Sequence, residues 1–283
     1  MYSKRQEDSD IFTNRIARTY FVRLFLLFFI TISPVCGYAS TDSGIAGFSK
    51  GRVIEVIDGD TIKVRLDEGS IETVRYLLID TPEVHHPKRG MEEMGKDALR
   101  ANKDIVGSKQ VFLETDILQR DRYGRLLAYV WLDKDKKILV NEKLVEKGFA
   151  LPLIIPPNEK YALRIHQALE VASSKGLGLW GRAEGRDFTA GQAWAELPYL
   201  KGNFVTLGLE VRDVLTQKRR NILLSEEGYF SVIIYESDMD KFSFLFPLQG
   251  KVLKIVGKIT AGYHGGEMLL KDPLQIMNFY SIK

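Results

Sequence analysis

The stretch Ile57-Asp58-Gly59-Asp60-Thr61 decides how the first folded part of the chain is interpreted. Asp-Gly is a strong signal for a tight turn between two strands. The residues on both sides, over 53–66, alternate between apolar and polar side chains, which is typical of half-buried strands. The sequence therefore predicts a β-hairpin that carries a carboxylate, Asp60, just after its turn.

A second acidic corner, Asp80-Thr81-Pro82-Glu83, follows an apolar run over residues 71–79 that predicts a third strand. Arg75 lies within this strand, and Arg125 ends a polar loop over 119–125. Guanidinium groups stay charged and match phosphate oxygens with a planar fork of donors. On a regular strand, Arg75 and Asp80 would point to opposite faces, so they converge only if the chain bends near its end.

The acidic residues suit a hard divalent cation. Asp60, Asp80 and the carbonyl of Thr81 offer oxygen ligands for Ca²⁺ or Mg²⁺, and no thiol or histidine pair is placed for zinc. Glu83 could act as a general base or orient the attacking water. Together with the arginines, this set predicts metal-assisted attack on a phosphodiester. Each acid taken alone is more simply a turn, capping or solvated residue.

Composition places the chain among ordinary globular proteins. Its 283 residues are 45% hydrophobic and 27% charged, which favours one or two domains. The 40 basic and 37 acidic residues give a net charge of +3. Because these charges nearly balance, total charge does not indicate a nucleic-acid-binding protein, and any basic surface must be local.

The N-terminus predicts export. A region with Arg15 and Arg18, an apolar block from residue 21, and small residues ending at Ala39 form a signal peptide over 1–39, followed by a flexible leader over 40–49. The protein is then secreted or periplasmic, without a membrane span once the signal is cleaved. The alternative is a membrane anchor through residues 21–35. Cys36 is the only cysteine and would leave with the signal, which excludes disulfides and thiolate chemistry.

The remaining chain divides into two units rich in short strands. Residues 50–180 show five short strands with helices, expected at 92–106, 138–147 and 159–174. Residues 181–203 show no clear period and are predicted to be a linker. Residues 204–283 show strands again, with one short helix at 238–242. The fold class is therefore mainly β (α+β), with two small β-barrels in succession.

Four motifs, in order and with matching spacing over residues 50–180, give the first unit a resemblance to the staphylococcal nuclease (thermonuclease) family. They are the hairpin motif over 56–61, Arg75 with the segment 77–83, Asp121-Arg122-Tyr123-Gly124-Arg125 with its following strand, and Val140-Asn141-Glu142-Lys143-Leu144-Val145.

The resemblance implies an oligonucleotide-binding-type barrel and Ca²⁺-dependent hydrolysis of DNA and RNA that leaves 3′-phosphate ends, by a protein expected to be monomeric. The family's functional positions fall on the metal ligands Asp60, Asp80 and Thr81, the catalytic residues Arg75, Glu83 and Arg125, and the phosphate contacts Arg122 and Tyr123. The rival class is a non-catalytic nucleic-acid-binding or scaffold protein built on the same barrel. The presence of all the expected side chains argues against that rival.

One segment departs from the family. After the second short helix, where the resemblance implies tyrosines against the bound nucleotide, residues 151–157 contain no aromatic side chain. Base stacking is therefore lost there or supplied from elsewhere.

The second unit is similar to small nucleic-acid-binding barrels and could add a nucleic-acid contact. Its candidate binding residues are the aromatic side chains Tyr229, Phe230, Tyr235 and Tyr263 and the basic run Lys218-Arg219-Arg220. The alternative is that the aromatic residues belong to the core and the basic run is a solvated turn.

Overall fold

The computed structural model describes residues 47–84, 90–262 and 265–281. The predicted signal peptide, its membrane-anchor alternative and Tyr263 lie outside the described residues. Within the described ranges, no helix combines the length and the apolar character needed to cross a membrane.

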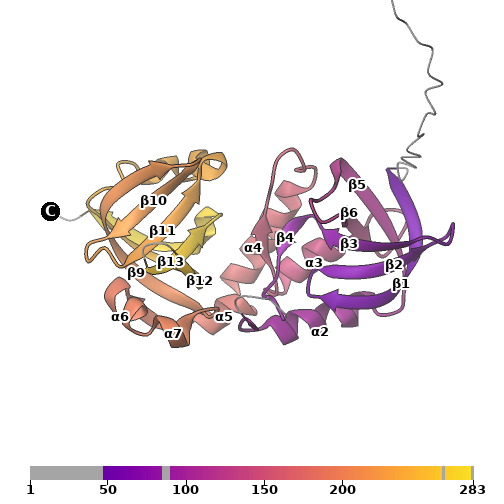
Figure 1. The fold of residues 1–283 in the computed structure, drawn as a ribbon, viewed down its shortest axis with the longest axis horizontal. Coiled ribbons are helices and arrows are strands. Elements are labelled where there is room, and N and C mark those ends of the chain that lie inside the picture. Colours follow the sequence, from indigo (N-terminus) through magenta and orange to yellow (C-terminus); the bar gives the residue numbers. More distant parts are fainter. Residues whose placement is uncertain (1–46, 85–89, 263–264, 282–283) are drawn as a thin grey trace, which may run out of the picture. The chain divides into compact units, whose positions relative to one another are not determined.

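The first barrel closes through five strands, as the sequence predicts (Figure 1). Its strands run in the order β1 (Phe48–Asp58), β2 (Thr61–Leu66), β3 (Ile71–Tyr76), β6 (Leu126–Trp131) and β5 (Gln110–Arg120), and β1 then pairs with β5. Only β3 and β6 are parallel neighbours. The hairpin turn is confirmed, since Asp58 pairs with Thr61 across it.

The glycine in this turn is required for a close approach. A Cβ atom at Gly59 would lie 2.6 Å from Oγ1 of Thr81. Glycine therefore allows the hairpin turn to lie directly against the second acidic corner, which places Asp60 beside Thr81.

The strand predicted over 71–79 is broken. It ends at Tyr76, and a short strand β4 (Leu78–Asp80) leaves the barrel to pair with β7 (Leu151–Leu153). Leu78 takes a φ of 64°, in the left-handed region that a branched side chain rarely adopts. Leu77, Leu78 and Ile79 are all buried, so the run shows no alternation. This bend supplies the convergence that Arg75 and Asp80 need.

Helices α2 (Gly95–Val106), α3 (Val140–Glu146), α4 (Ala162–Ser174) and α5 (Leu179–Ala183) contribute to the core of the first barrel. The apolar face predicted for α4 is buried at Ile165, Leu169 and Ala172. Phe204 and Val256, from the second barrel, belong to this same core cluster.

The second barrel repeats the topology of the first without repeating its sequence. Its strands are β9 (Phe204–Gln217), β10 (Arg220–Ser225), β11 (Phe230–Tyr235), β12 (Lys251–Gly262) and β13 (Gly265–Leu270), with β14 (Ile276–Ser281) on the edge of β12. The ring β9-β10-β11-β13-β12 closes through a β12–β9 pairing, and β11 and β13 are parallel. The short helix expected at 238–242 lies within the 3-10 helix η1 (Glu236–Leu245), and a second 3-10 helix, η2 (Pro273–Gln275), precedes β14.

The stretch predicted to be a linker is folded, which corrects that interpretation. Besides the end of α5, it holds β8 (Asp187–Thr189), α6 (Ala190–Ala195) and α7 (Leu197–Leu200). Strand β8 joins β9 in parallel, and a capping box between Thr189 and Gln192 starts α6. Elements of three to six residues are too short to show a period in the sequence, which is why they were not predicted.

A buried carboxylate ties β5 of the first barrel to its neighbours. Glu114 is buried and accepts hydrogen bonds from Lys160 Nζ at 2.6 Å and from Trp131 Nε1 and Tyr161 Oη at 3.0 Å, while Lys136 Nζ lies 2.8 Å away. Burial acts to raise the pKa of Glu114, but the hydrogen bonds from Lys136, Lys160 and Tyr161 together outweigh it and lower the pKa.

Replacing Glu114 with glutamine is expected to lower the free energy of unfolding by about 1–3 kcal/mol at neutral pH. A lowered pKa in the folded state favours the ionised form, so this stabilisation is present above the pKa of the unfolded state and is lost as the pH falls through the folded value. Denaturant unfolding of the wild type and of Glu114→Gln across acidic and neutral pH measures this. A difference that stayed constant from neutral to strongly acidic pH would contradict the role of the charge.

Candidate active site

Hydrogen bonds hold Asp60 against the second acidic corner. The backbone N–H and the hydroxyl of Thr81 each donate to Asp60 Oδ2 at 3.0 Å, and the Thr61 hydroxyl donates to Oδ1 at 3.0 Å. Asp60 is buried. The hairpin and the end of β4 therefore meet at one carboxylate.

Arg75 joins the two predicted metal acids. Its Nη2 lies 3.1 Å from Asp60 Oδ2 and 3.1 Å from Asp80 Oδ1. Its Nη1 donates to the carbonyl oxygens of Tyr76 and Ile79, both at 2.9 Å. The Arg75 guanidinium thus binds the backbone before and after the bend at Leu78, and it lies between the two carboxylates.

The electrostatics of this corner suit a cation. Burial raises the pKa of Asp60, the charge of Asp80 raises it further, and the Arg75 guanidinium acts in the opposite direction. Two neighbouring carboxylates in a low-dielectric setting are stabilised by positive charge, and their oxygens, with the Thr81 carbonyl, are the donors that Ca²⁺ or Mg²⁺ prefers. The residues present therefore fit a hard divalent cation. Over the described ranges, no three His, Cys, Asp or Glu side chains gather at one point to hold a metal, so the predicted set depends on a backbone oxygen as well.

Glu83 lies beside a carboxylate that the sequence assigns only to the turn. Its side chain shares a hydrogen bond with Asp58, and burial, this hydrogen bond and the nearby charges of Asp58, Asp80 and Glu92 all raise the pKa of Glu83. Asp58 also accepts a hydrogen bond from the N–H of Gly59 at 2.8 Å. Asp58 is therefore both a turn residue and a partner of Glu83.

The backbone around Glu83 is held by Glu92, which is buried. Oε2 of Glu92 accepts from the N–H of Glu83 at 3.1 Å, and the N–H of Glu92 donates to the Glu83 carbonyl at 2.9 Å. The same Oε2 atom accepts from Lys258 Nζ at 2.6 Å, so a cation on β12 of the second barrel reaches the corner through one carboxylate.

The loop that carries the predicted phosphate contacts is organised by Asp121. Its carboxylate accepts from the N–H groups of Tyr123 and Arg125, at 2.9 and 3.0 Å, and from Arg125 Nε at 2.7 Å. Gly124 has a φ of 80°, which glycine adopts without strain. Arg122 lies 4.7 Å from the centroid of the exposed Tyr123 ring, a cation–π distance.

A cavity of about 630 Å³ brings the predicted arginines together. Arg75, Arg122, Tyr123 and Arg125 all line it. Arg75 therefore faces the phosphate contacts on one side and the two metal acids on the other. Glu83 does not line this cavity, and the structure places it beside Asp58 instead.

Sequence reasoning missed Asp58, Glu92 and Asp121 as supporting residues. The role of Asp121 could have been predicted, because the side chain of an aspartate that begins a turn ending in glycine commonly accepts hydrogen bonds from the backbone of that turn. The role of Glu92 could not, since the fold determines that it contacts Glu83 and Lys258.

The aromatic residues proposed for the second barrel separate into different environments. Phe230 is fully buried in the core, so it is not a stacking surface. Tyr229 stacks on Trp194 with ring centroids 4.5 Å apart, and Tyr235 is 43% exposed.

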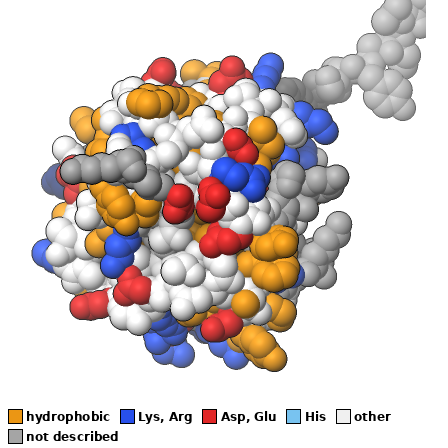
Figure 2. All heavy atoms as spheres, turned by 90° about the vertical axis from the view of Figure 1, so that its left-hand side faces the viewer, with side chains coloured by type: hydrophobic (Ala, Val, Ile, Leu, Met, Phe, Trp, Pro, Cys, Tyr) orange, Lys and Arg blue, Asp and Glu red, His pale blue; other side chains and the backbone are white. Residues whose placement is uncertain are grey.

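The basic run of the second barrel lies at a turn. Lys218 and Arg219 are exposed there with positive φ angles. Figure 2 shows one face of the molecule, on which acidic, basic and hydrophobic side chains are mixed.

Comparisons with known proteins identify the family of the chain. The family model described as staphylococcal nuclease homologue matches residues 73–182. The chain is 42% identical to the thermonuclease of Staphylococcus intermedius over 130 residues, which are 46% of this chain and 75% of that protein. Two proteins of Bacillus subtilis are also 42% identical: the SPbeta prophage-derived endonuclease YokF, over 44% of this chain and 42% of that protein, and endonuclease YncB, over 45% and 59%. The chain thus spans less than two thirds of YokF and YncB but three quarters of the thermonuclease, and it belongs to the staphylococcal nuclease family.

Proposed function

We propose that the protein is an exported nuclease that uses Ca²⁺ to hydrolyse phosphodiester bonds of DNA or RNA and leaves 3′-phosphate ends. The observation that carries this proposal is the position of Arg75, which lies between Asp60 and Asp80 and also lines the cavity of Arg125. Similarity to proteins named thermonuclease and endonuclease supports it. Export rests on the sequence of residues 1–39, and recovery of the protein inside cells with Met1 intact would contradict it.

The proposed mechanism divides the work among these side chains. Asp60, Asp80 and the Thr81 carbonyl would hold the cation, which when bound would polarise the phosphodiester and offset its charge. Arg75 and Arg125 would donate hydrogen bonds to the phosphate oxygens, where negative charge grows in the transition state. Glu83 would accept the proton of the attacking water. The water oxygen bonds to phosphorus, the bond to the 5′ oxygen breaks, and the 5′ oxygen takes a proton from solvent, so that a 3′-phosphate and a 5′-hydroxyl result.

The rival function is nucleic-acid binding without cleavage. A barrel used only for binding needs no carboxylates beside its phosphate contacts, because they repel the phosphate backbone. A buried carboxylate, Asp60, and a half-buried one, Asp80, beside a guanidinium favour hydrolysis over this rival.

Calcium removal tests the proposal directly. Single-stranded DNA and RNA should be cleaved in Ca²⁺, and a chelator should abolish cleavage, with restoration when Ca²⁺ is added in excess. End-labelling of the products should show 3′-phosphates. Equal cleavage with and without chelator would refute the metal mechanism, whereas binding without any cleavage in Ca²⁺ would favour the rival.

A further inference from the structure

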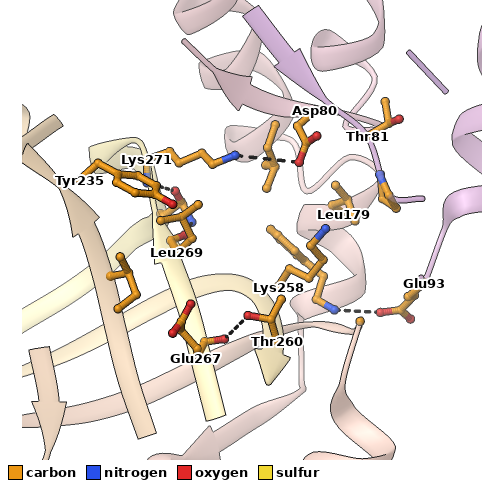
Figure 3. A pocket seen from close by; sticks show the side chains of 16 residues that line it. Asp80, Thr81, Glu93, Leu179, Tyr235, Lys258, Thr260, Glu267, Leu269 and Lys271 are labelled. Carbon is orange, nitrogen blue, oxygen red and sulfur yellow. Dashed lines mark hydrogen bonds and ion pairs between the residues drawn. The ribbon is translucent and has the colours of Figure 1, made fainter. Parts of the chain in front are cut away.

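A second cavity lies beside Asp80, one of the two proposed metal acids, and is lined by residues of both barrels. It has a volume of about 310 Å³, and its walls include Asp80 and Thr81 from the first barrel and Tyr235, Lys258 and Lys271 from the second (Figure 3). Ligand pockets commonly hold about 300–1,000 Å³, so this one falls at the size of a small group such as a nucleobase with its sugar. Asp80 and Thr81, two of the proposed metal ligands, are part of its wall.

Lys271 brings positive charge to this cavity. Its Nζ lies 3.9 Å from Asp80 Oδ2, and its side chain is largely buried. In Figure 3 the lysine extends from the second barrel toward Asp80. The Lys271 ammonium is therefore within reach of a phosphate group that approaches Asp80. Its positive charge also partly offsets the repulsion between Asp80 and the nucleic-acid backbone.

Tyr235 brings an aromatic ring to the same cavity. It ends β11 and remains 43% exposed, and it also lines an adjoining cavity of about 290 Å³ together with residues 152–156. This is the apolar segment that lacks an aromatic side chain. The fold therefore brings the ring of Tyr235 to the same cavity as this segment.

We propose, resting on the nuclease function above, that this cavity is a nucleotide subsite. Tyr235 stacks on an unpaired base next to the scissile phosphate, and Lys271 contacts a neighbouring phosphate. The ligand class is a single-stranded nucleic acid, because a base must leave its pair to stack on a side chain. The second barrel thereby supplies part of the substrate site of the first.

Binding of fluorescein-labelled single-stranded DNA, measured by anisotropy in chelator, tests the stacking. Tyr235→Ala should weaken binding roughly five- to hundredfold, and Tyr235→Phe should restore most of it. A second measurement replaces one nucleotide of the DNA at a time with an abasic nucleotide. The affinity of the wild type should fall most when the abasic nucleotide occupies one particular position. At that position the same replacement should not lower the affinity of Tyr235→Ala any further. Tyr199→Ala is the matched control, since Tyr199 is highly exposed and lines neither cavity.

The salt dependence of binding tests Lys271. Lys271→Gln should reduce the slope of log K against log salt by about 0.7, the value for one phosphate contact on a single strand. Lys254→Gln is the control, because Lys254 lies on the same barrel, pairs with Asp187 at 2.7 Å and lines neither cavity.

Unchanged affinity and an unchanged abasic profile in Tyr235→Ala, or an unchanged slope in Lys271→Gln, would overturn the subsite. These binding measurements need no cleavage, so they test the subsite independently of the nuclease function. A wild-type protein that binds DNA but does not cleave it in Ca²⁺ would refute the nuclease proposal and not the subsite.

Discussion

Replacing Arg75 with alanine is expected to lower kcat for single-stranded DNA about a thousandfold in Ca²⁺. The guanidinium contacts both predicted metal acids, and Arg75 also lines the cavity of Arg125. Its removal takes away a charged donor where the transition state gains negative charge. Single-turnover kinetics with saturating substrate measure the loss, because they separate the chemical step from binding.

The same replacement also removes a buried structural contact. Arg75 is largely buried and holds the carbonyl oxygens of Tyr76 and Ile79 as well as the two carboxylates. The free energy of unfolding should therefore fall by about 3 kcal/mol. Arg75→Lys separates the two roles, since it retains the charge and loses the planar fork. We expect Arg75→Lys to recover much of the stability but little of the rate. Full recovery of the rate with lysine would contradict a role for bidentate phosphate contact.

Replacing Glu83 with glutamine is expected to lower kcat by roughly a hundred- to ten-thousandfold, the range of a general base. Glutamine has nearly the same shape and can still hydrogen bond to Asp58, so the corner should keep its structure. The rate of a single turnover in Ca²⁺, with thermal unfolding measured in parallel, tests this.

The matched control is Glu68→Gln, because Glu68 lies in the exposed turn between β2 and β3 of the same barrel. Turnover of Glu83→Gln within a few-fold of the control would show that Glu83 does not accept the proton.

Local sequence patterns were sufficient to predict the elements that are determined by residues close together in the sequence. The Asp58-Gly59 turn and the buried face of α4 follow from turn chemistry and from a helical period. The candidate site residues follow from the motifs and the family resemblance that these motifs support, and their roles stay predictions. The structure brings Asp60, Asp80 and Thr81 together through Arg75 and hydrogen bonds.

Elements that depend on distant partners were not predictable. The bend at Leu78 requires β4 to pair with β7, which lies far along the chain. The folded stretch after residue 181 depends on the second barrel, since β8 exists only as a neighbour of β9. Hydrophobic periodicity contains no information about either pairing.

The ion pair between Glu92 and Lys258 connects the first barrel to the second. A shortened chain that ends before Phe204 would lose the ion pair between Lys258 and Glu92, and it would remove the Phe204 and Val256 side chains from the core of the first barrel. An unfilled core is costly. The first barrel is therefore expected to be stable only together with the second, and grafting it onto another scaffold would require a replacement for the contacts of Phe204 and of β12.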